Sequence, residues 1–268
     1  MSEFFKDTFK RFKPKKVFGD GHGALVVSTK LGTCVVTDSR GNKVKYTCVE
    51  KEFVDKHTFD KAVKGFQYLS TKTGIKDYFP EVYHIGREDN TIRMAYFACQ
   101  TLEHYCMSID IFDETNERTL NGLFLSINDM LNTLIYNDIV HGDLHSGNIL
   151  VCLSKYKPMV NLKVIDVDEA GPIKNPVEWD EETKTFKEKD EKGQVSDKYD
   201  DAAKLGLTIR SDFVIGSIRR MREAAGHKNK KARIHVDERK EWEARVENRL
   251  HQFSNLGKLC MKGSDFAE

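Results

Sequence analysis

The stretch that decides the fold is His141 to Leu150, HGDLHSGNIL, together with Val164 to Ala170, VIDVDEA, further along the chain. In the first stretch, Asp143 and Asn148 are five residues apart within a glycine-containing loop. In the second, Asp166 follows a short apolar run. Phosphoryl transfer needs one group that orients an acceptor hydroxyl, and oxygen ligands that hold Mg²⁺ against the nucleotide phosphates. The order and spacing of these three residues indicate that chemistry.

The residues around the loop support the same interpretation. Ile149 to Leu153 has the apolar and β-branched composition of a short buried strand, and Leu162 to Ile165 is suited to be its hairpin partner, with a turn near residues 155–158. Asp and Asn are also common in ordinary turns, so each residue alone fits a structural role. The three residues in this order favour the phosphoryl-transfer interpretation.

These motifs resemble those of the protein-kinase-like superfamily. The loop is similar to the HGDLHxGN form of aminoglycoside, choline and lipopolysaccharide kinases and of some bacterial effector and viral protein kinases. The resemblance implies an ATP- and Mg²⁺-dependent phosphotransferase with Asp143 as the catalytic base and Asn148 and Asp166 as metal ligands. It also implies an α+β fold with two lobes, a β-rich N-lobe and a reduced helical C-lobe.

The chain departs from the common protein-kinase pattern at three positions. Gly142 replaces the arginine that can pair with a phosphorylated activation loop, so switching by that route is not expected. His145 stands where many Ser/Thr kinases have a lysine. The metal motif reads Asp166-Val167-Asp168 in place of Asp-Phe-Gly, and Asp168 is either a second acidic ligand or a solvated carboxylate. The metal motif is more similar to that of the small-molecule kinases than to Asp-Phe-Gly.

A nucleotide-binding turn is expected near the N-terminus. Gly19, Gly21 and Gly23 in VFGDGHGALV would let the backbone lie close to phosphates, although a glycine-rich hairpin alone is a weak signal. The stretch 94–102, MAYFACQTL, is the expected hinge that receives adenine. Met94 is a candidate for the back of that pocket, and a buried strand methionine is the alternative.

The lysine that contacts the phosphates is expected on the strand Lys43 to Phe53. Lys51 is the preferred residue and Lys45, on the same strand face, is the alternative. The next segment, Asp55 to Thr73, has the apolar spacing of an amphipathic helix. It contains no glutamate to pair with the lysine, and Asp60 and Gln67 are the only substitutes.

The C-terminal part is expected to be helical. Helices are predicted at about 119–138, 199–224 and 237–261, and Asp201 matches the aspartate of a kinase C-lobe helix that binds the catalytic-loop backbone. The charged stretch 179–192 is expected to be a mobile part of the activation segment, and 227–233 a basic loop.

Composition limits the alternatives. The 268 residues suit one kinase-like domain, with an N-lobe at about 1–97, a hinge at about 98–102 and a C-lobe at about 103–268. The 43 basic and 42 acidic residues nearly cancel, so no overall charge favours nucleic acid. No apolar run suggests a transmembrane segment or secretory signal, although residues 1–16 are basic and amphipathic.

The six cysteines show no metal-binding spacing and are expected to be reduced thiols, which indicates a cytoplasmic, reducing compartment, including that of a host cell. The preferred function is a protein kinase with a Ser/Thr acceptor. A small-molecule or sugar kinase is the first alternative. A pseudokinase, meaning a nucleotide-binding scaffold, is the second, motivated by the missing helix glutamate.

Overall fold

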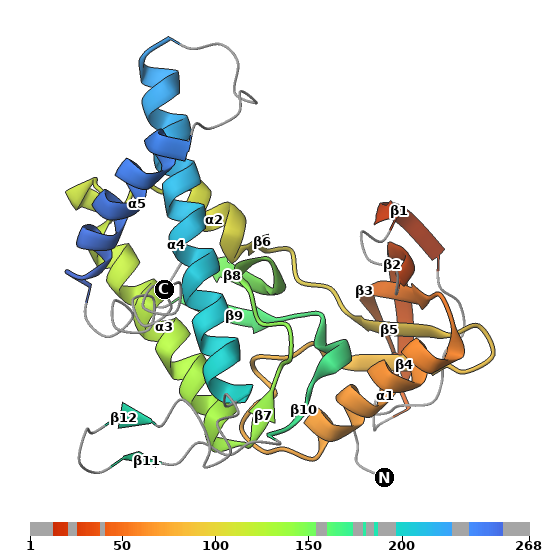
Figure 1. Cartoon of the computed structure of the whole chain (residues 1–268). Helices are drawn as coiled ribbons and strands as arrows, with labels where there is room; N and C mark the ends of the chain where they lie inside the picture. The colour runs from red at the N-terminus through yellow and green to blue at the C-terminus, as the bar shows by residue number, and fades with distance from the viewer. Residues whose placement is uncertain are drawn as a thin grey trace. The chain divides into compact units, whose positions relative to one another are not determined.

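The computed structural model describes residues 13–20, 26–37, 41–153, 160–173, 179–180, 185–186, 197–226 and 236–253. It is a mixed α and β structure with antiparallel sheets (Figure 1). The chain divides into two compact units. The first comprises Met1–Ala98 with Val164–Pro172, and the second comprises Cys99–Lys163 with Ile173–Glu268. The first boundary, after Ala98, falls at the start of the expected hinge.

The first unit is built on a five-stranded sheet in the order β1-β2-β3-β5-β4. Its elements are β1 (Lys13–Asp20), β2 (Val26–Thr37), β3 (Lys43–Phe53), α1 (Lys56–Ser70), β4 (Val82–Gly86), β5 (Thr91–Ala95), η3 (Val167–Glu169) and β10 (Gly171–Pro172). β3 has the bounds predicted from the sequence. β2 pairs with β3 antiparallel, from Thr37 opposite Lys43 onward, and residues 38–40 lie outside the described part of the chain.

Helix α1 forms where the apolar spacing predicts it. Asp55 caps its start, because the carboxylate accepts a hydrogen bond of 2.8 Å from the Thr58 N–H. The helix buries Phe59, Ala62, Val63, Phe66 and Leu69, the same residues that define the pattern in the sequence.

The segment Val164–Pro172 packs with the first unit, although its place in the chain assigned it to the expected C-lobe. Gly65 of α1 makes this contact close. A β-carbon at Gly65 would lie 2.6 Å from the carbonyl oxygen of Val167, a distance that real β-carbons do not adopt. The absence of a side chain therefore lets α1 lie directly against η3.

The second unit is mainly helical. Its elements are β6 (Gln100–Thr101), α2 (Leu102–Ser108), η1 (Glu114–Asn116), α3 (Glu117–Tyr136), β7 (Ile139–Val140), η2 (Ser146–Asn148), β8 (Ile149–Leu153), β9 (Val160–Val164), β11 (Trp179–Asp180), β12 (Thr185–Phe186), α4 (Asp197–Ala224) and α5 (Val236–Leu250). Strands β6, β8 and β9 form a three-stranded sheet that contains the predicted hairpin. The predicted turn near 155–158 lies outside the described residues, as do most of 179–192 and the loop 227–233.

Aromatic contacts join the long helices α3 and α4, which Figure 1 labels. Phe124 of α3 meets Phe213 of α4 edge to face with ring centroids 6.3 Å apart, and it meets Phe253 after α5 at 5.2 Å. Helix α5 ends at Leu250, so it is shorter than the helix predicted at about 237–261. Residues beyond 253 are not described. Among the described residues, no helix combines the length and apolar content needed to cross a membrane.

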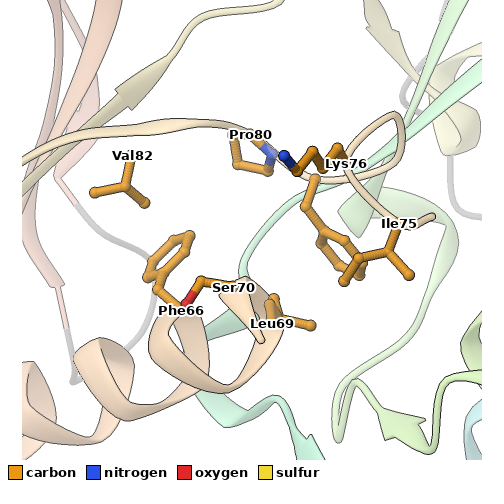
Figure 2. Close-up of a pocket in the computed structure, with 8 residues that line it drawn as sticks. Phe66, Leu69, Ser70, Ile75, Lys76, Pro80 and Val82 are labelled. Atoms are coloured by element: carbon orange, nitrogen blue, oxygen red, sulfur yellow. The ribbon is translucent and has the colours of Figure 1, made fainter. Parts of the chain in front are cut away.

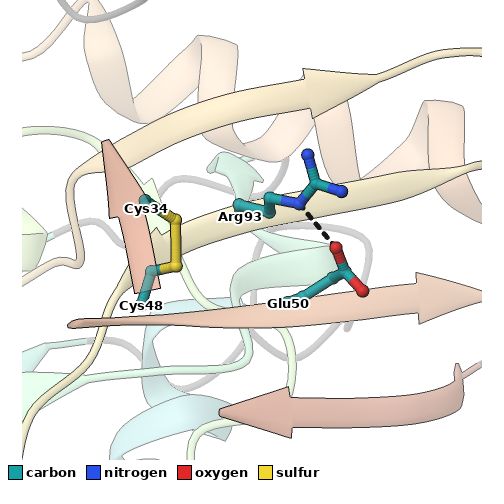
Figure 3. Close-up of a disulfide and its surroundings, with 4 residues drawn as sticks. All are labelled: Cys34, Cys48, Glu50 and Arg93. Atoms are coloured by element: carbon teal, nitrogen blue, oxygen red, sulfur yellow. Dashed lines mark hydrogen bonds and ion pairs between the residues drawn. A yellow bond between two sulfur atoms is a disulfide. The ribbon is translucent and has the colours of Figure 1, made fainter. Parts of the chain in front are cut away.

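The cysteines differ from the sequence-based expectation of reduced thiols. Cys34 and Cys48 form a disulfide between β2 and β3, and Cys99 and Cys152 form a second one in the other unit. Cys106 is buried and is not in a disulfide. The first pair is fully buried beside Tyr83, and the ion pair between Arg93 and Glu50 lies nearby (Figure 3). The expectation was therefore wrong for these four residues, because the sequence does not show which cysteines are neighbours in space.

Candidate active site

The sequence-predicted site residues fall into two sets, one in each unit. The second unit contains the loop with Asp143 and Asn148. The Asn148 amide nitrogen donates a 3.0 Å hydrogen bond to the backbone oxygen of Asp143 and lies 3.5 Å from its carboxylate. The loop therefore holds the candidate base and one candidate metal ligand next to each other.

Asp201 of α4 fixes the backbone of this loop. Its carboxylate accepts hydrogen bonds from the N–H groups of His141, Gly142 and Leu144 at 2.7, 3.3 and 3.4 Å. Gly142 has a φ of 82°, which a glycine adopts without strain. This is the contact expected from the resemblance, and it explains how α4 can keep the loop in one conformation.

Two further α4 residues, which were not predicted, hold the next part of the loop. The Thr208 hydroxyl accepts a hydrogen bond of 3.1 Å from the Ser146 N–H, and Asp212 accepts one of 2.5 Å from the Ser146 hydroxyl. Burial raises the pKa of Asp212 to about 6, and the charge of Glu103 adds to the increase while the Ser146 hydrogen bond opposes it. Their positions, seven and eleven residues after Asp201, place them on the same helix face and could have suggested this role.

Two nitrogen-bearing side chains approach the Asp143 carboxylate. Lys204 of α4 forms an ion pair with Oδ1, and Nε2 of His145 lies 3.7 Å from Oδ2. Sequence analysis singled out His145 and did not identify Lys204. The carboxylate of Asp143, the candidate base, is partly exposed and is paired with the Lys204 ammonium.

The first unit contains Lys51, Asp166 and Asp168. The Lys51 ammonium forms ion pairs with the carboxylate of Asp166 and, at 3.1 Å, with that of Asp168. Burial opposes the charge on Lys51, but the two carboxylates outweigh it and raise the pKa of the ammonium above its ordinary value. Asp166 has a left-handed backbone with a φ of 64°, which is uncommon for a residue other than glycine and occurs often at functional sites.

The alternative lysine and the helix substitutes do not join this group. Lys45 is exposed near the start of β3, opposite Val35. The ion-pair partners of Lys51 are Asp166 and Asp168, and neither Asp60 nor Gln67 of α1 is among them. Helix α1 contributes a different ion pair to this region, because Lys61 contacts Glu169 at 2.7 Å.

The nucleotide-binding residues are described only in part. Gly19 lies in β1 opposite Thr29, next to a register shift, whereas Gly21 and Gly23 lie outside the described residues. Met94 is 7% exposed in β5 and is opposite Val49 and Val82 on the flanking strands. This placement is compatible with a buried core residue and with the wall of an adenine pocket.

Whether Mg²⁺ fits the acidic pair can be tested on Asp168. Its Oδ1 atom is buried without a hydrogen-bond partner, and burial raises the pKa of its carboxyl even though Lys51 opposes this. An unpartnered carboxylate oxygen beside Asp166 is the kind of ligand that Mg²⁺ binds. Within the described ranges, no group of three or more His, Cys, Asp or Glu side chains is arranged around one point. The first unit therefore offers two neighbouring carboxylates with the oxygen ligands that Mg²⁺ prefers, and both are paired with Lys51.

A separate apolar pocket lies in the first unit, between the end of α1 and the segment that follows it (Figure 2). Phe66 and Leu69 of α1 line it together with Ile75, Phe79 and Pro80. Its lining contains none of the residues predicted for catalysis or metal binding. The pocket therefore does not add to the candidate active site.

No protein-family model matches this chain, and no curated protein matches it. Its function is therefore inferred from the residues and contacts of the two sets.

Proposed function

We propose that the protein is an ATP- and Mg²⁺-dependent phosphotransferase with a two-lobed, kinase-like architecture. Asp143 takes the proton of the acceptor hydroxyl, and the acceptor oxygen forms a bond to the γ-phosphorus while the bond to the ADP oxygen breaks. Lys51 binds the nucleotide phosphates, with Gly19, Gly21 and Gly23 as backbone contacts and Met94 beside the adenine. Asn148 and Asp166 hold Mg²⁺, which when bound neutralises charge on the phosphate oxygens.

One observation carries the proposal. Lys51 is paired with Asp166, a residue 115 positions away that the sequence motifs had assigned to the metal site. A buried lysine beside two carboxylates, one of them in a left-handed backbone, is a costly arrangement that a structural role alone does not require. The loop around Asp143 supports the same function, because three N–H groups fixed by Asp201 give it a defined conformation.

The preferred acceptor is a protein hydroxyl, with Ser or Thr favoured over other acceptors. The charged stretch at 179–192 follows Asp166 in the position of a kinase activation segment, which suits a protein acceptor. The HGDLHSGN loop and His145 favour the alternative, a small-molecule or sugar kinase.

A nucleotide-binding scaffold is a second candidate, and the geometry of Lys51 favours it. The two carboxylates already neutralise the ammonium, and α1 provides no glutamate to draw the lysine away from them. A protein with this arrangement would bind nucleotide without transferring phosphate.

Two measurements separate these functions. ATP with Mg²⁺ should raise the melting temperature of the wild type, because a ligand that binds only the native state stabilises it, and Asp166→Asn should abolish the shift. Wild type should transfer label from γ-³²P-ATP to casein or to itself, and Asp143→Asn should lose transfer but keep the shift. The exposed Asp129→Asn is the matched control for both variants.

Each result leads to a different conclusion. Label on a metabolite panel but not on protein would favour the small-molecule kinase. A melting shift without transfer to any acceptor would favour the scaffold. Neither shift nor transfer by the wild type would contradict the proposal.

The redox state of the cysteines bears on the cytoplasmic, reducing compartment that the sequence indicates. Disulfides persist mainly in oxidising compartments, so Cys34–Cys48 and Cys99–Cys152 argue against a reducing one. Blocking free thiols at the moment of cell lysis, followed by peptide mass spectrometry, would show which state exists in the cell.

A further inference from the structure

One face of α4 carries a polar stripe that follows the catalytic loop residue by residue. The stripe consists of Asp201, Lys204, Thr208 and Asp212, which are spaced three, four and four residues apart and so share one side of the helix. Its members contact, in order along the helix, the loop backbone at 141–144, the Asp143 carboxylate, the Ser146 N–H and the Ser146 hydroxyl. Four residues on one face of α4 therefore contact successive parts of the loop between residues 141 and 146.

Lys204 is the cationic member of this stripe, and its ammonium contacts Oδ1 of Asp143. The two side chains are 43% and 45% exposed. Ion pairs this accessible to water add little to stability because solvent screens them and ordering long side chains is unfavourable. Asp201 and Asp212 are buried, Thr208 is half-buried, and all three accept hydrogen bonds from the loop. Anchoring of the loop therefore does not depend on Lys204.

The chemistry of the loop leaves a need for a cation. A phosphoryl group in transfer carries negative charge on its peripheral oxygens, and enzymes place lysine, arginine or metal ions against that charge. The stretch 141–148, HGDLHSGN, contains no lysine or arginine. A lysine or arginine beside Asp143, acting in addition to Lys51 and Mg²⁺, therefore has to come from another element, and α4 brings Lys204 to that carboxylate.

We propose that Lys204 is a further catalytic residue for phosphoryl transfer, which holds the Asp143 carboxylate before the reaction and stabilises the transferring phosphoryl group during it. The inference rests on the proposed function. When Asp143 accepts the proton of the acceptor hydroxyl, its negative charge disappears and its attraction for the ammonium falls. The Lys204 ammonium keeps its own proton and is then drawn to the phosphoryl oxygens, where the charge has moved.

The test compares Lys204→Met, Lys204→Arg and the exposed control Lys240→Met with the wild type. The measurements are kcat and KM for γ-³²P-ATP with Mg²⁺ and casein, self-phosphorylation, and the melting temperature. Methionine keeps the apolar stem of the side chain and removes only the charge. Removing one preorganised charge donor typically lowers kcat by about 10²-fold, which is the effect expected for Lys204→Met.

The KM for ATP should change by less than about threefold, because Lys204 binds Asp143 while ATP is bound and contacts the phosphoryl oxygens only during transfer. The melting temperature should stay at the wild-type value. Lys204→Arg should recover at least about tenfold of the lost kcat, since arginine restores the cation, whereas Lys240→Met should match the wild type.

The test distinguishes a wrong role for Lys204 from a wrong proposed function. If the wild type transfers phosphate and Lys204→Met does so at the same kcat, or if arginine restores nothing, Lys204 has no role in transfer while the proposed function stands. If the wild type transfers no phosphate to any acceptor, the proposed function is wrong and the role of Lys204 is wrong with it.

Discussion

Lys51 is the residue whose surroundings say most about the candidate site. Its side chain is 14% exposed and that of Asp168 is 13% exposed, so this pair is largely removed from water. Partners of this kind depend on each other, because a buried charge that loses its counterion becomes strongly unfavourable. The lysine therefore supports the local fold as well as being a candidate phosphate contact.

Replacing Lys51 by methionine should lower the free energy of unfolding by about 3 kcal/mol near neutral pH, because Asp168 is left without its buried cation. Burial already raises the pKa of Asp168, and loss of the lysine removes the contact that opposes this rise. An acid whose pKa is higher in the native than in the unfolded state destabilises the fold as pH increases. The loss of stability should therefore shrink as the pH is lowered and Asp168 becomes protonated.

Urea unfolding of wild type, Lys51→Met and Lys51→Met/Asp168→Asn at several pH values checks this expectation. The double variant should recover much of the stability lost at neutral pH, and Lys45→Met should behave like the wild type because Lys45 is exposed. A loss that does not vary with pH would show that Asp168 does not depend on Lys51.

At this scale, the sequence identified some residues and could not identify others. Asp143, Asn148 and Asp166 could be proposed as candidates from the sequence because they lie at fixed spacing within short motifs. Lys51 was preferred, but Lys45 stayed an alternative because both lie on the same strand face, and the contact that distinguishes them is with the distant Asp166. Lys204 was missed because its partner is 61 residues away in sequence.

Helix α4 is the element that holds the second set of site residues together. Asp212 is 7% exposed, and burial raises the pKa of its carboxyl to about 6. The native state therefore favours the neutral carboxyl, whereas the unfolded chain ionises at its ordinary, lower pKa. This element should lose stability as the pH rises through the range between the two values.

Asp212→Asn should reveal this loss, because asparagine cannot ionise and still accepts the Ser146 hydrogen bond. The variant should equal or slightly trail the wild type at about pH 4 and become relatively more stable up to about pH 6, with no further gain above that value. Chemical denaturation of both proteins across this range measures the difference. Asp129→Asn, which removes an exposed carboxyl from α3, should show no comparable trend, and a parallel trend in both would contradict the assignment to Asp212.

The long helices and strand β3 could be predicted from the sequence, whereas the short helix α2 could not. Helices α1, α3 and α4 and strand β3 are long enough for burial to repeat along one face, so their patterns are visible in the sequence. Helix α2 has seven residues and was not predicted, because two turns do not make a recognisable period. Its position depends instead on close packing against α4. A β-carbon added at Gly216 of α4 would lie only 2.5 Å from the backbone oxygen of Met107 in α2.

In the whole molecule, the two compact units are not continuous in the chain. The boundary after Ala98 lies where the hinge was expected, but Val164–Pro172 returns to the first unit. Nothing in the composition of this segment indicates the return, which depends on Gly65 of α1 allowing close contact with Val167. Each unit also contains its own disulfide, and pairings of this kind depend on proximity in the fold and not on spacing in the sequence.

The two disulfides should contribute unequally to stability. Cys99–Cys152 closes a separation of 53 residues and Cys34–Cys48 one of 14, so loop entropy assigns them about 4 and about 3 kcal/mol. Cys99→Ala/Cys152→Ala should therefore lower the free energy of unfolding somewhat more than Cys34→Ala/Cys48→Ala, although cavities left by the buried pair reduce the contrast. Reductant should destabilise the wild type and both double variants but leave the quadruple variant unchanged. In denaturant without reductant, iodoacetamide should label Cys106 and spare the four paired cysteines, and labelling of those four would show that the bonds do not form.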